Sequence, residues 1–373
     1  MNTYWIWLSR VKYVGPVLQK ELISHFQTPE AVYKASEDEL KEVPNLSTRA
    51  LESLINSRSL KEAETIQERA EQTKIKILPF DSRLYPDFAK ESRESPILLY
   101  CRGELEPLET TVGVVGARRC SPYGRKIAEQ LGEELASLKI PLISGFAKGI
   151  DSYSQSACIR RGGYTISFLG SGPDVCYPHE QRQLYHQVLD CGGAFISQHP
   201  PGTPPIRQHF ITRNALISAW STELIIVEAS EQSGALSTAN FTKKINRPLY
   251  AVPNRIDSPE GIGTNQLLSQ GIPPYLGIQS LQAVKQKRST LVGKINPTNI
   301  NFTQLPPSAS HNRPNLKPTN TQAKIMNLLS ENPTTIQQLS IQLHLSEVEL
   351  VDQLFHLELE NQIIMRGNLV SKI

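Results

Sequence analysis

Hydrophobic positions in the first 72 residues recur at helical spacing and predict a run of short helices. Two sets of positions share this spacing: Val17, Leu18, Leu22 and Phe26, and then Leu40, Val43, Leu51, Leu54 and Ile55. Between the two sets, Ser36 and Glu39 form the pattern of a capping box, which marks the start of a helix. Residues 1–72 are therefore predicted to form a small helical domain.

The turns of this helical domain raise the question of DNA contact. Residues 14–33 look like a helix-hairpin-helix or SAM-like module, and some modules of that kind grip the DNA backbone through glycine hairpins. The first hairpin contains Gly15, but the second, at residues 43–46, reads Val-Pro-Asn-Leu and has no glycine. We therefore favour a structural or dimer-forming role for residues 1–72.

A different pattern begins at about residue 73. After an extended stretch at 74–103, short apolar runs alternate with amphipathic segments of helix length, at residues 112–115, 140–143, 164–169, 194–197, 224–228 and 248–252. Strand-like runs that alternate with helices indicate βαβ units and a parallel sheet. Residues 73–285 are predicted to form an α/β domain with an extended Rossmann-like, doubly wound, mostly parallel sheet. Ligands of such sheets bind beyond the carboxyl ends of the strands.

The C-terminal part of the chain divides into a linker and a compact module. Residues 286–320 are rich in Asn, Pro, Ser and Thr, contain Lys and Arg but no Asp or Glu, and predict a basic flexible linker. Residues 321–373 carry three helical patterns and a hairpin pattern, which together indicate a winged helix. Its third helix holds five carboxylates and no lysine or arginine, so its charge favours contact with protein over contact with DNA.

Composition adds an expectation about the compartment and excludes several classes of protein. The 373-residue chain has a formal net charge of +3, a weak hint of an anionic partner. Its five cysteines form no C-x-x-C pair, so neither zinc ligation nor a disulfide framework is indicated. No stretch approaches the roughly 20 apolar residues of a membrane-spanning helix, and the N-terminus does not read as a signal peptide. We expect a cytoplasmic protein that makes no membrane contact.

The stretch at residues 141–151 organises the candidate chemistry of the sheet domain. It ends an apolar run and opens a helix, and Ser144, Gly145 and Gly149 make a turn with Lys148 at its tip. Small residues let main-chain N–H groups approach a ligand, and a helix N-terminus favours negative charge. The turn therefore has the ingredients of a phosphate site, although a glycine turn between strand and helix is also plain topology.

Other predicted strand ends repeat these residue types at the same sheet edge. Glycine, hydroxyl or cationic residues occur at five turns, which are residues 116–121, 144–149, 170–174, 198–203 and 233–237. One such turn is weak evidence, but five at one edge indicate an anionic ligand. The first turn lacks the G-x-G-x-x-G fingerprint and no acidic residue ends the second strand, so a dinucleotide is not expected. We predict neither a cofactor nor a metal ion.

Carboxylates at the strand ends are the candidates for acid–base catalysis. Asp151 is most simply a helix N-cap. Glu228 is interpreted as a cap for the turn at 233–234 or as a partner that orders Arg213. No Ser-His-Asp or metal-ligand spacing emerges from the sequence, and we predict no catalytic residue.

With these motifs in place, the sequence resembles the DprA/Smf family, the DNA-processing proteins of natural transformation. The resemblance covers residues 75–285, and it rests on these motifs: Val115-Gly116-Ala117-Arg118, Ser144-Gly145-Phe146-Ala147-Lys148-Gly149-Ile150-Asp151, Gly170-Ser171-Gly172-Pro173-Asp174, Pro200-Pro201-Gly202-Thr203, Arg213-Asn214, Ser233-Gly234-Ala235-Leu236 and Gly263-Thr264-Asn265. The flanking modules are arranged as in the longer members. The chain departs from the family pattern at Ala117, Gln155, Gln198, Ala215 and Asn254, which leaves the role of a lost histidine at 155 open.

The resemblance implies a homodimeric protein that binds single-stranded DNA, protects incoming DNA and loads the RecA recombinase onto it. The candidate DNA-binding residues are Gly116, Arg118, Arg119, Ser121, Ser144, Gly145, Phe146, Lys148, Gly149, Ser171, Gly172, Arg213, Asn214, Ser233 and Gly234. Their cations would supply charge, and their glycine turns and serine hydroxyls would donate hydrogen bonds to phosphates. Phe146 has two alternatives, which are stacking on a base and packing in the core.

The alternative function is an enzyme of the nucleotide phosphoribohydrolase type. Those Rossmann-like proteins carry a Pro-Gly-Gly-x-Gly-Thr-x-x-Glu turn. Residues 233–238 read Ser-Gly-Ala-Leu-Ser-Thr at the corresponding place, without the glutamate. The sequence therefore favours the DNA-binding function over the enzyme.

Overall fold

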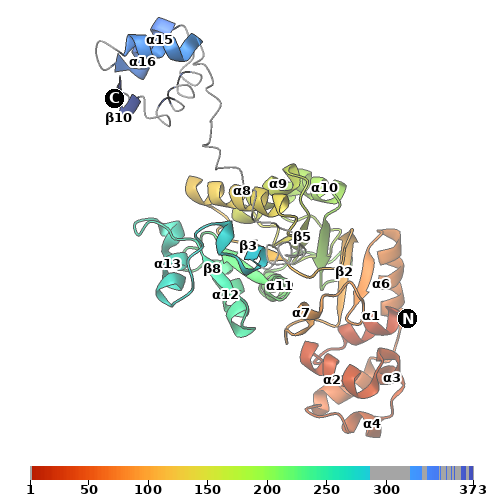
Figure 1. Cartoon of the computed structure of the whole chain (residues 1–373). Helices are drawn as coiled ribbons and strands as arrows, with labels where there is room; N and C mark the ends of the chain where they lie inside the picture. The colour runs from red at the N-terminus through yellow and green to blue at the C-terminus, as the bar shows by residue number, and fades with distance from the viewer. Residues whose placement is uncertain are drawn as a thin grey trace, which may run out of the picture. The chain divides into compact units, whose positions relative to one another are not determined.

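A computed structural model of the chain describes residues 2–285, 320–329, 334–343, 345, 350, 354, 357, 363–366 and 369–372. The chain divides into two compact units, Met1–Ile295 and Asn296–Ile373. Figure 1 shows the elements of both units in chain order. Within the described residues, no helix is long and apolar enough to cross a membrane.

Six short helices open the first unit, as the hydrophobic spacing predicts. They are α1 (Asn2–Arg10), α2 (Pro16–Phe26), α3 (Pro29–Lys34), α4 (Glu37–Lys41), α5 (Thr48–Asn56) and α6 (Lys61–Gln72). The predicted capping box is confirmed: the Ser36 side chain accepts from the main-chain N–H of Glu39, and the Glu39 carboxylate accepts from that of Ser36. These helices share a buried cluster with Ile75, Leu98 and Tyr100, so their core continues into the sheet that follows.

The two hairpins of the helical segment follow the same backbone course. In the first, the Val14 N–H donates to Val11 O and Tyr13 adopts a φ of 64°. In the second, the Leu46 N–H donates to Val43 O and Asn45 adopts a φ of 62°. Asparagine tolerates the left-handed region better than most residues. The absence of glycine from the second hairpin therefore does not give it a different backbone course from the first.

An eight-stranded sheet forms the centre of the first unit. Its strands are β1 (Lys76–Pro79), β2 (Leu98–Gly103), β3 (Val112–Val115), β4 (Leu142–Ser144), β5 (Thr165–Phe168), β6 (Ala194–Ser197), β7 (Glu223–Ile226) and β8 (Leu249–Ala251). Their order is β1-β2-β6-β5-β4-β3-β7-β8; β2 runs antiparallel to its neighbours β1 and β6, and all other neighbouring strands are parallel. The sheet confirms the predicted Rossmann-like, mostly parallel fold.

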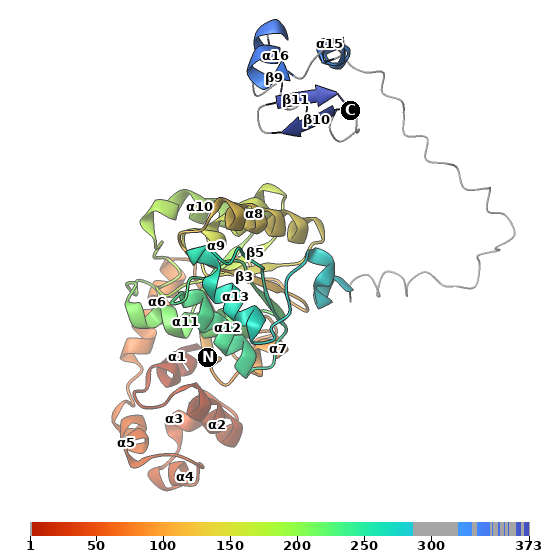
Figure 2. The same ribbon diagram turned by 90° about the vertical axis from the view of Figure 1, so that its left-hand side faces the viewer.

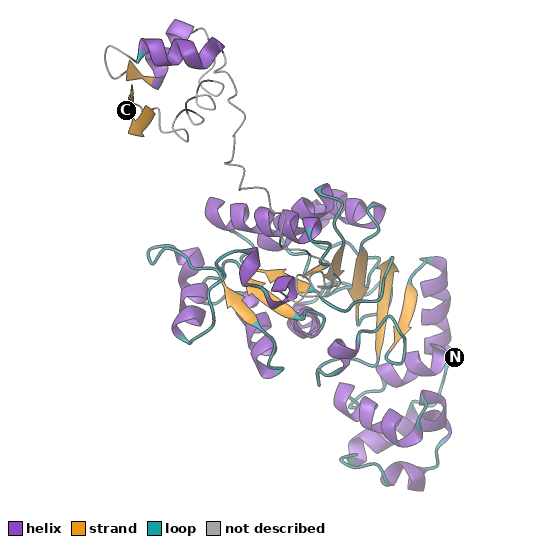
Figure 3. Cartoon of the chain, viewed as in Figure 1, coloured by secondary structure: helices purple, strands orange, loops and turns teal. Residues whose placement is uncertain are grey.

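Helices cover both faces of this sheet, as Figures 2 and 3 show. They are α7 (Asp87–Lys90), α8 (Pro122–Ser137), α9 (Ile150–Arg160), α10 (Arg182–Asp190), α11 (Arg207–Ala219), α12 (Gly234–Lys244) and α13 (Ile262–Ser269), with 3-10 turns η1 (His179–Gln181), η2 (Pro259–Gly261) and η3 (Ile278–Ser280). One core cluster joins α8 and α9 to one face of β3, and another joins α11 and α12 to the opposite face. Burial on both faces explains why these strands read as continuous apolar runs.

The direction of winding reverses between β3 and β7. From β3 the chain adds β4, β5 and β6 on one side, and then α11 carries it across to β7 on the other side. In doubly wound sheets, the crevice at such a reversal, beyond the carboxyl ends of the strands, is the usual ligand site. The turns after β3 and β7 border this crevice.

The second unit is described by itself and only in part. Its elements are α15 (Asn320–Leu328), β9 (Thr334–Thr335), α16 (Ile336–Leu343), β10 (Ile363–Arg366) and β11 (Leu369–Lys372). The predicted hairpin is confirmed, because β10 pairs antiparallel with β11. The linker predicted at 286–320 lies outside the described residues except for Asn320, where α15 begins. Most of the acidic third helix also lies outside them, so the winged helix stays a prediction.

Candidate nucleic-acid interface

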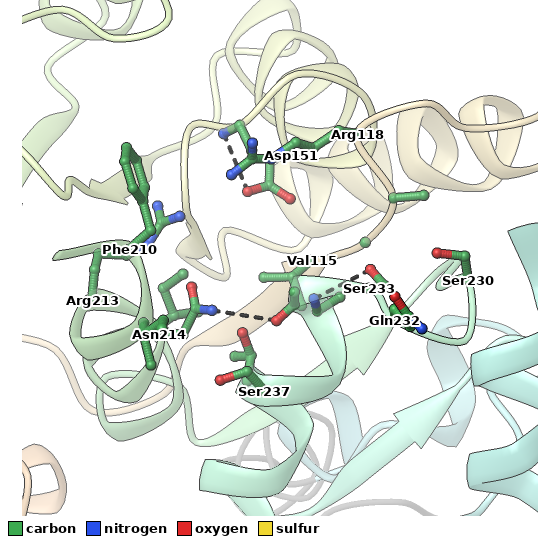
Figure 4. Close-up of a pocket in the computed structure, with 18 of the residues that line it drawn as sticks. Val115, Arg118, Asp151, Phe210, Arg213, Asn214, Ser230, Gln232, Ser233 and Ser237 are labelled. Atoms are coloured by element: carbon green, nitrogen blue, oxygen red, sulfur yellow. Dashed lines mark hydrogen bonds between the residues drawn. The ribbon is translucent and has the colours of Figure 1, made fainter. Parts of the chain in front are cut away.

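Two adjoining hollows lie beyond the carboxyl ends of the parallel strands. The larger, of about 900 Å³, sits at the winding reversal; we call it the switch-point hollow, with Gly116, Arg118, Arg207, Asn214 and Gly234 in its wall (Figure 4). The smaller, of about 370 Å³, we call the side hollow, and its wall includes Lys148, Gly170, Ser171, Tyr177 and Glu180. Arg118, Ala147, Tyr177, Phe210 and Arg213 line both. The structure thus gathers most of the predicted turns around one continuous depression.

The glycine turn after β4 is held by a buried carboxylate of the chain. Asp151 accepts hydrogen bonds from the main-chain N–H groups of Gly145 and Ala147, at 3.1 and 3.3 Å. The interpretation of Asp151 as a helix N-cap is wrong, because α9 begins at Ile150 and its N-cap is Gly149. Part of the N–H array predicted to receive phosphate is therefore occupied from within.

Arg213 is buried beside the same turn. Its guanidinium donates to Gly145 O and, at 2.8 Å, to Phe168 O, and its Nε has no partner among the described residues. Burial lowers the pKa of Arg213 to about 10, against the opposing influence of Asp151. Burial also raises the pKa of Asp151, which Arg213 in turn opposes. The predicted cation Arg213 thus ties two strand ends together from the interior, although its surface contributes to both hollows.

A second buried carboxylate occupies the start of α8. Glu228 accepts from the main-chain N–H of Ser121 at 2.9 Å and also from the Ser121 hydroxyl. A Cβ at Gly124 would stand 2.2 Å from the Glu228 carboxyl carbon, so this position needs glycine. Both interpretations of Glu228 from the sequence are wrong, because its carboxylate binds Ser121 at the start of α8. It neither caps the turn at 233–234 nor orders Arg213. The negative charge that a helix N-terminus favours is supplied by the chain.

The predicted serine donors divide in the same way. The Ser144 hydroxyl donates to Val114 O at 2.7 Å, and the Ser171 hydroxyl donates to Val175 O at 2.9 Å. A hydroxyl has a single O–H to donate, so neither serine has a donor left for a phosphate. The Ser233 oxygen only accepts, from the N–H of Ala235 at 3.3 Å, and keeps its own hydrogen for a ligand.

Phe146 lies in the core and not on the surface. Its side chain is fully buried, and its ring meets that of Phe195 edge-on at 5.0 Å between centroids. Of the two alternatives for Phe146, the structure supports core packing. The buried ring has no exposed face on which a base could stack. The Phe146 backbone has a φ of 55°. In the same turn Gly149 has a positive φ, and a Cβ added there would stand 2.2 Å from Ala117 O, so this position needs glycine.

Three of the four predicted cations are exposed at the rim of the hollows. Arg118 and Arg119 follow β3, and Lys148 stands at the tip of the turn after β4. The Lys148 ammonium forms an ion pair with Glu180 at 2.9 Å. The Arg118 guanidinium lies 5.9 Å from the centroid of the Phe210 ring. Positive charge therefore faces solvent where strand ends and hollows meet.

Two aromatic rings beside these cations are absent from the sequence-based candidates. Tyr177 is 38% exposed, and its ring lies 5.6 Å from that of Phe210 at an interplanar angle of 47°. Phe210 sits on α11 between Arg207 and Asn214, which also line the switch-point hollow. The sequence did carry a signal for Phe210, because Arg207, Phe210 and Asn214 are spaced by three and four residues and therefore lie on one face of a helix.

The remaining polar groups near the site serve the interior. The side chain of Gln155, where the family commonly has histidine, is fully buried and donates to the hydroxyls of Thr165 and Ser167. The rings of His199 and His209 stack at 3.6 Å, and burial and His209 lower the pKa of His199 to about 4. In the described part of the chain, no three His, Cys, Asp or Glu side chains group as metal ligands.

Comparison with known proteins places this geometry in a family. The sequence model of DNA recombination-mediator protein A matches residues 76–284. Protein Smf of Synechocystis sp. is 31% identical over 361 residues, which are 91% of this chain and 90% of that protein. The DNA processing protein DprA of Bacillus subtilis is 33% identical over 204 residues, 53% of this chain and 67% of that protein.

Two solved structures extend the comparison. DprA of Streptococcus pneumoniae superposes with a TM-score of 0.65 at 23% identity, covering 75% of this chain and 96% of that one, and shows the fold. DprA of Helicobacter pylori, whose structure concerns a single-stranded DNA binding mode, superposes with a TM-score of 0.50 at 26% identity, covering 59% of this chain and 97% of that one. The sequence motifs, the sheet and these matches agree, and the chain belongs to the DNA recombination-mediator protein A (DprA/Smf) family.

Proposed function

We propose that this protein binds single-stranded DNA across the two hollows. The observation that carries the proposal is the exposure, at one sheet edge, of Arg118, Arg119 and Lys148 beside the rings of Tyr177 and Phe210. Cations that track the backbone, together with aromatic rings for the bases, are the usual means of gripping a single strand. The single-stranded DNA bound by the H. pylori relative supports the same ligand class.

The two halves of the depression offer different contacts to a strand. Around the switch-point hollow, Arg118 supplies charge, and the start of α12 supplies its helix N-terminus at the exposed Gly234 and the hydroxyl hydrogen of Ser233. Around the side hollow, Lys148 supplies charge and Tyr177 an exposed ring. Phosphates would follow the cations and the helix end while bases stack on the rings.

The nucleotide hydrolase alternative is weakened by the fate of the carboxylates. Asp151, Asp174 and Glu228, which follow strands of the sheet along the chain, each accept hydrogen bonds from main-chain N–H groups. A carboxylate committed to such bonds is poorly placed to transfer protons to a substrate. The proposal is therefore that the protein acts by binding and not by catalysis.

The biological setting completes the proposal. By resemblance to its family, the protein would act as a homodimer that protects incoming single strands and loads the RecA recombinase onto them. Exposed apolar side chains that a protein partner could cover include Ile256, 96% exposed, and Leu276, 77% exposed.

A binding titration with single-stranded and duplex DNA of equal length, repeated at several salt concentrations, tests the proposal. Three exposed cations predict a log–log salt slope of about −2 per protomer, at about −0.7 for each phosphate neutralised on a single strand. Weak, salt-independent binding together with release of free base from a nucleoside monophosphate would overturn the proposal in favour of the hydrolase.

A further inference from the structure

Two contacts connect the turn that carries Lys148 to the 3-10 turn η1. The Lys148 ammonium meets the Glu180 carboxylate at 2.9 Å, with both side chains more than half exposed. Next to Glu180, the Gln181 side-chain amide donates to Phe146 O at 3.0 Å and is buried. The buried contact holds the two turns side by side, so the exposed ion pair bridges the mouth of the side hollow.

The Glu180 carboxylate, which pairs with Lys148, differs from the other carboxylates of the site in its exposure to solvent. Asp151 and Glu228 are buried, and their oxygens accept hydrogen bonds from main-chain N–H groups. Glu180 lies on the surface, where water can solvate it as soon as it leaves the lysine. An exposed ion pair is weak, so a phosphate oxygen can replace this carboxylate at little cost.

We propose that Glu180 is a displaceable internal anion that competes with a DNA phosphate for Lys148. The inference rests on the proposed function and adds a regulatory element to it. In the free protein Glu180 occupies the ammonium; a bound strand displaces it, and on release the carboxylate returns. Glu180 therefore weakens the grip on the strand and speeds its dissociation, which suits a protein that passes its strand on.

The alternative role for Glu180 is positioning, in which the carboxylate holds Lys148 ready for the phosphate. The two roles predict opposite signs for the same variant. Competition predicts tighter binding when the carboxylate loses its charge, whereas positioning predicts weaker binding. The lowered pKa of Glu180, which follows from its hydrogen bond to Lys148, fits either role and does not decide between them.

The experiment compares E180Q with the wild-type full-length chain in fluorescence titrations and stopped-flow dissociation with an oligothymidylate of about 20 nucleotides. Competition predicts about two- to fivefold tighter binding, carried mainly by slower dissociation. The salt slope should stay close to the wild-type value, because Lys148 neutralises the same phosphate in both proteins. Equal thermal melting of the two proteins is expected, since Glu180 is exposed.

Two further variants separate this effect from general electrostatics. E231Q removes the same charge from an exposed residue of the turn after β7 that lies outside both hollows. It should tighten binding less than E180Q does. In a Lys148→Ala background, E180Q should lose its advantage and behave like E231Q.

Each outcome decides a claim. Weaker binding by E180Q would establish positioning and overturn the competition, and an unchanged affinity and dissociation rate would remove the ion pair from the mechanism. A gain that persists in the Lys148→Ala background would also overturn the proposal. If the wild-type protein binds no single strand at any salt concentration, the proposed function itself fails, which is distinguishable from all of these results.

Discussion

The buried turns and the exposed rim of the same sheet edge contain similar residue types but use them differently. Inside, Asp151 and Glu228 occupy the N–H groups of two glycine turns, and Arg213 ties strand ends together. At the rim, Arg118 and Lys148 face solvent beside the exposed ring of Tyr177 and the half-buried ring of Phe210. The difference is burial: a buried polar group must find a partner within the chain, while an exposed one is available to a ligand.

This comparison also revises the expected charge of the interface. Four cations were predicted from the sequence to meet phosphates, but Arg213 is 5% exposed and already donates to two carbonyl oxygens. Burying an arginine is tolerated only where its hydrogen bonds are met internally. Three cations, Arg118, Arg119 and Lys148, therefore remain for the backbone of a strand.

The largest effect should come from Asp151→Ala. Removing this carboxylate leaves Arg213 buried without its counter-charge and the N–H groups of Gly145 and Ala147 without an acceptor. Leaving a buried charge uncompensated in this way costs about 3–5 kcal/mol of unfolding free energy. Urea unfolding measures it. Asp257→Ala, which breaks the exposed ion pair with Arg255, is the control and should leave unfolding unchanged. Equal stability of both variants would contradict the division into inside and rim.

The next effect separates two phenylalanines. Phe146→Ala should destabilise the protein by about 3–5 kcal/mol, because it empties part of a packed core. Phe210→Ala should leave thermal melting near wild type and weaken single-strand binding by about 1–3 kcal/mol for one lost stacked base. The salt slope should not change, since stacking releases no counterions. A Phe210→Ala protein with full affinity would leave the rim without its aromatic platform.

A smaller effect belongs to the rim cations. Lys148→Ala and Arg118→Ala should each make the salt slope shallower by about 0.7 and weaken binding alike on different base sequences. Both residues are exposed, so melting should stay at the wild-type value. Titrations at four salt concentrations measure the slope. If both slopes equal that of the wild type, phosphates do not meet these residues.

The smallest effect is expected from deletion of residues 321–373. The carboxylates predicted for the third helix of this segment would repel phosphate, so affinity for a single strand should change less than twofold. The deletion falls within the second compact unit and removes no residue of the first. A tenfold loss, equivalent to about 1.4 kcal/mol, would show that the charge argument fails.

Local sequence patterns predicted the strands and the capping box, because these depend on neighbours along the chain. The apolar run at 112–115, for instance, coincides with β3. The partners of the carboxylates were out of reach, since Glu228 meets Ser121 across 107 positions and no local pattern records such a contact. The burial of Phe146 could not be predicted for a related reason. Whether the side chain of a turn residue points inward depends on the elements packed against it, which here are β6 and α10.

The cluster shared by the N-terminal helices and β2 has a consequence for how such proteins gain and lose modules. The family match begins at residue 76, but the helices before it cover Leu98 and Tyr100 of β2. A chain that started at residue 76 would expose these apolar side chains on a face of the sheet, which promotes aggregation. Inheritance of the sheet without the helices therefore requires compensating polar substitutions on β2. The boundary of the family match at residue 76 is therefore not a boundary at which this protein can be truncated.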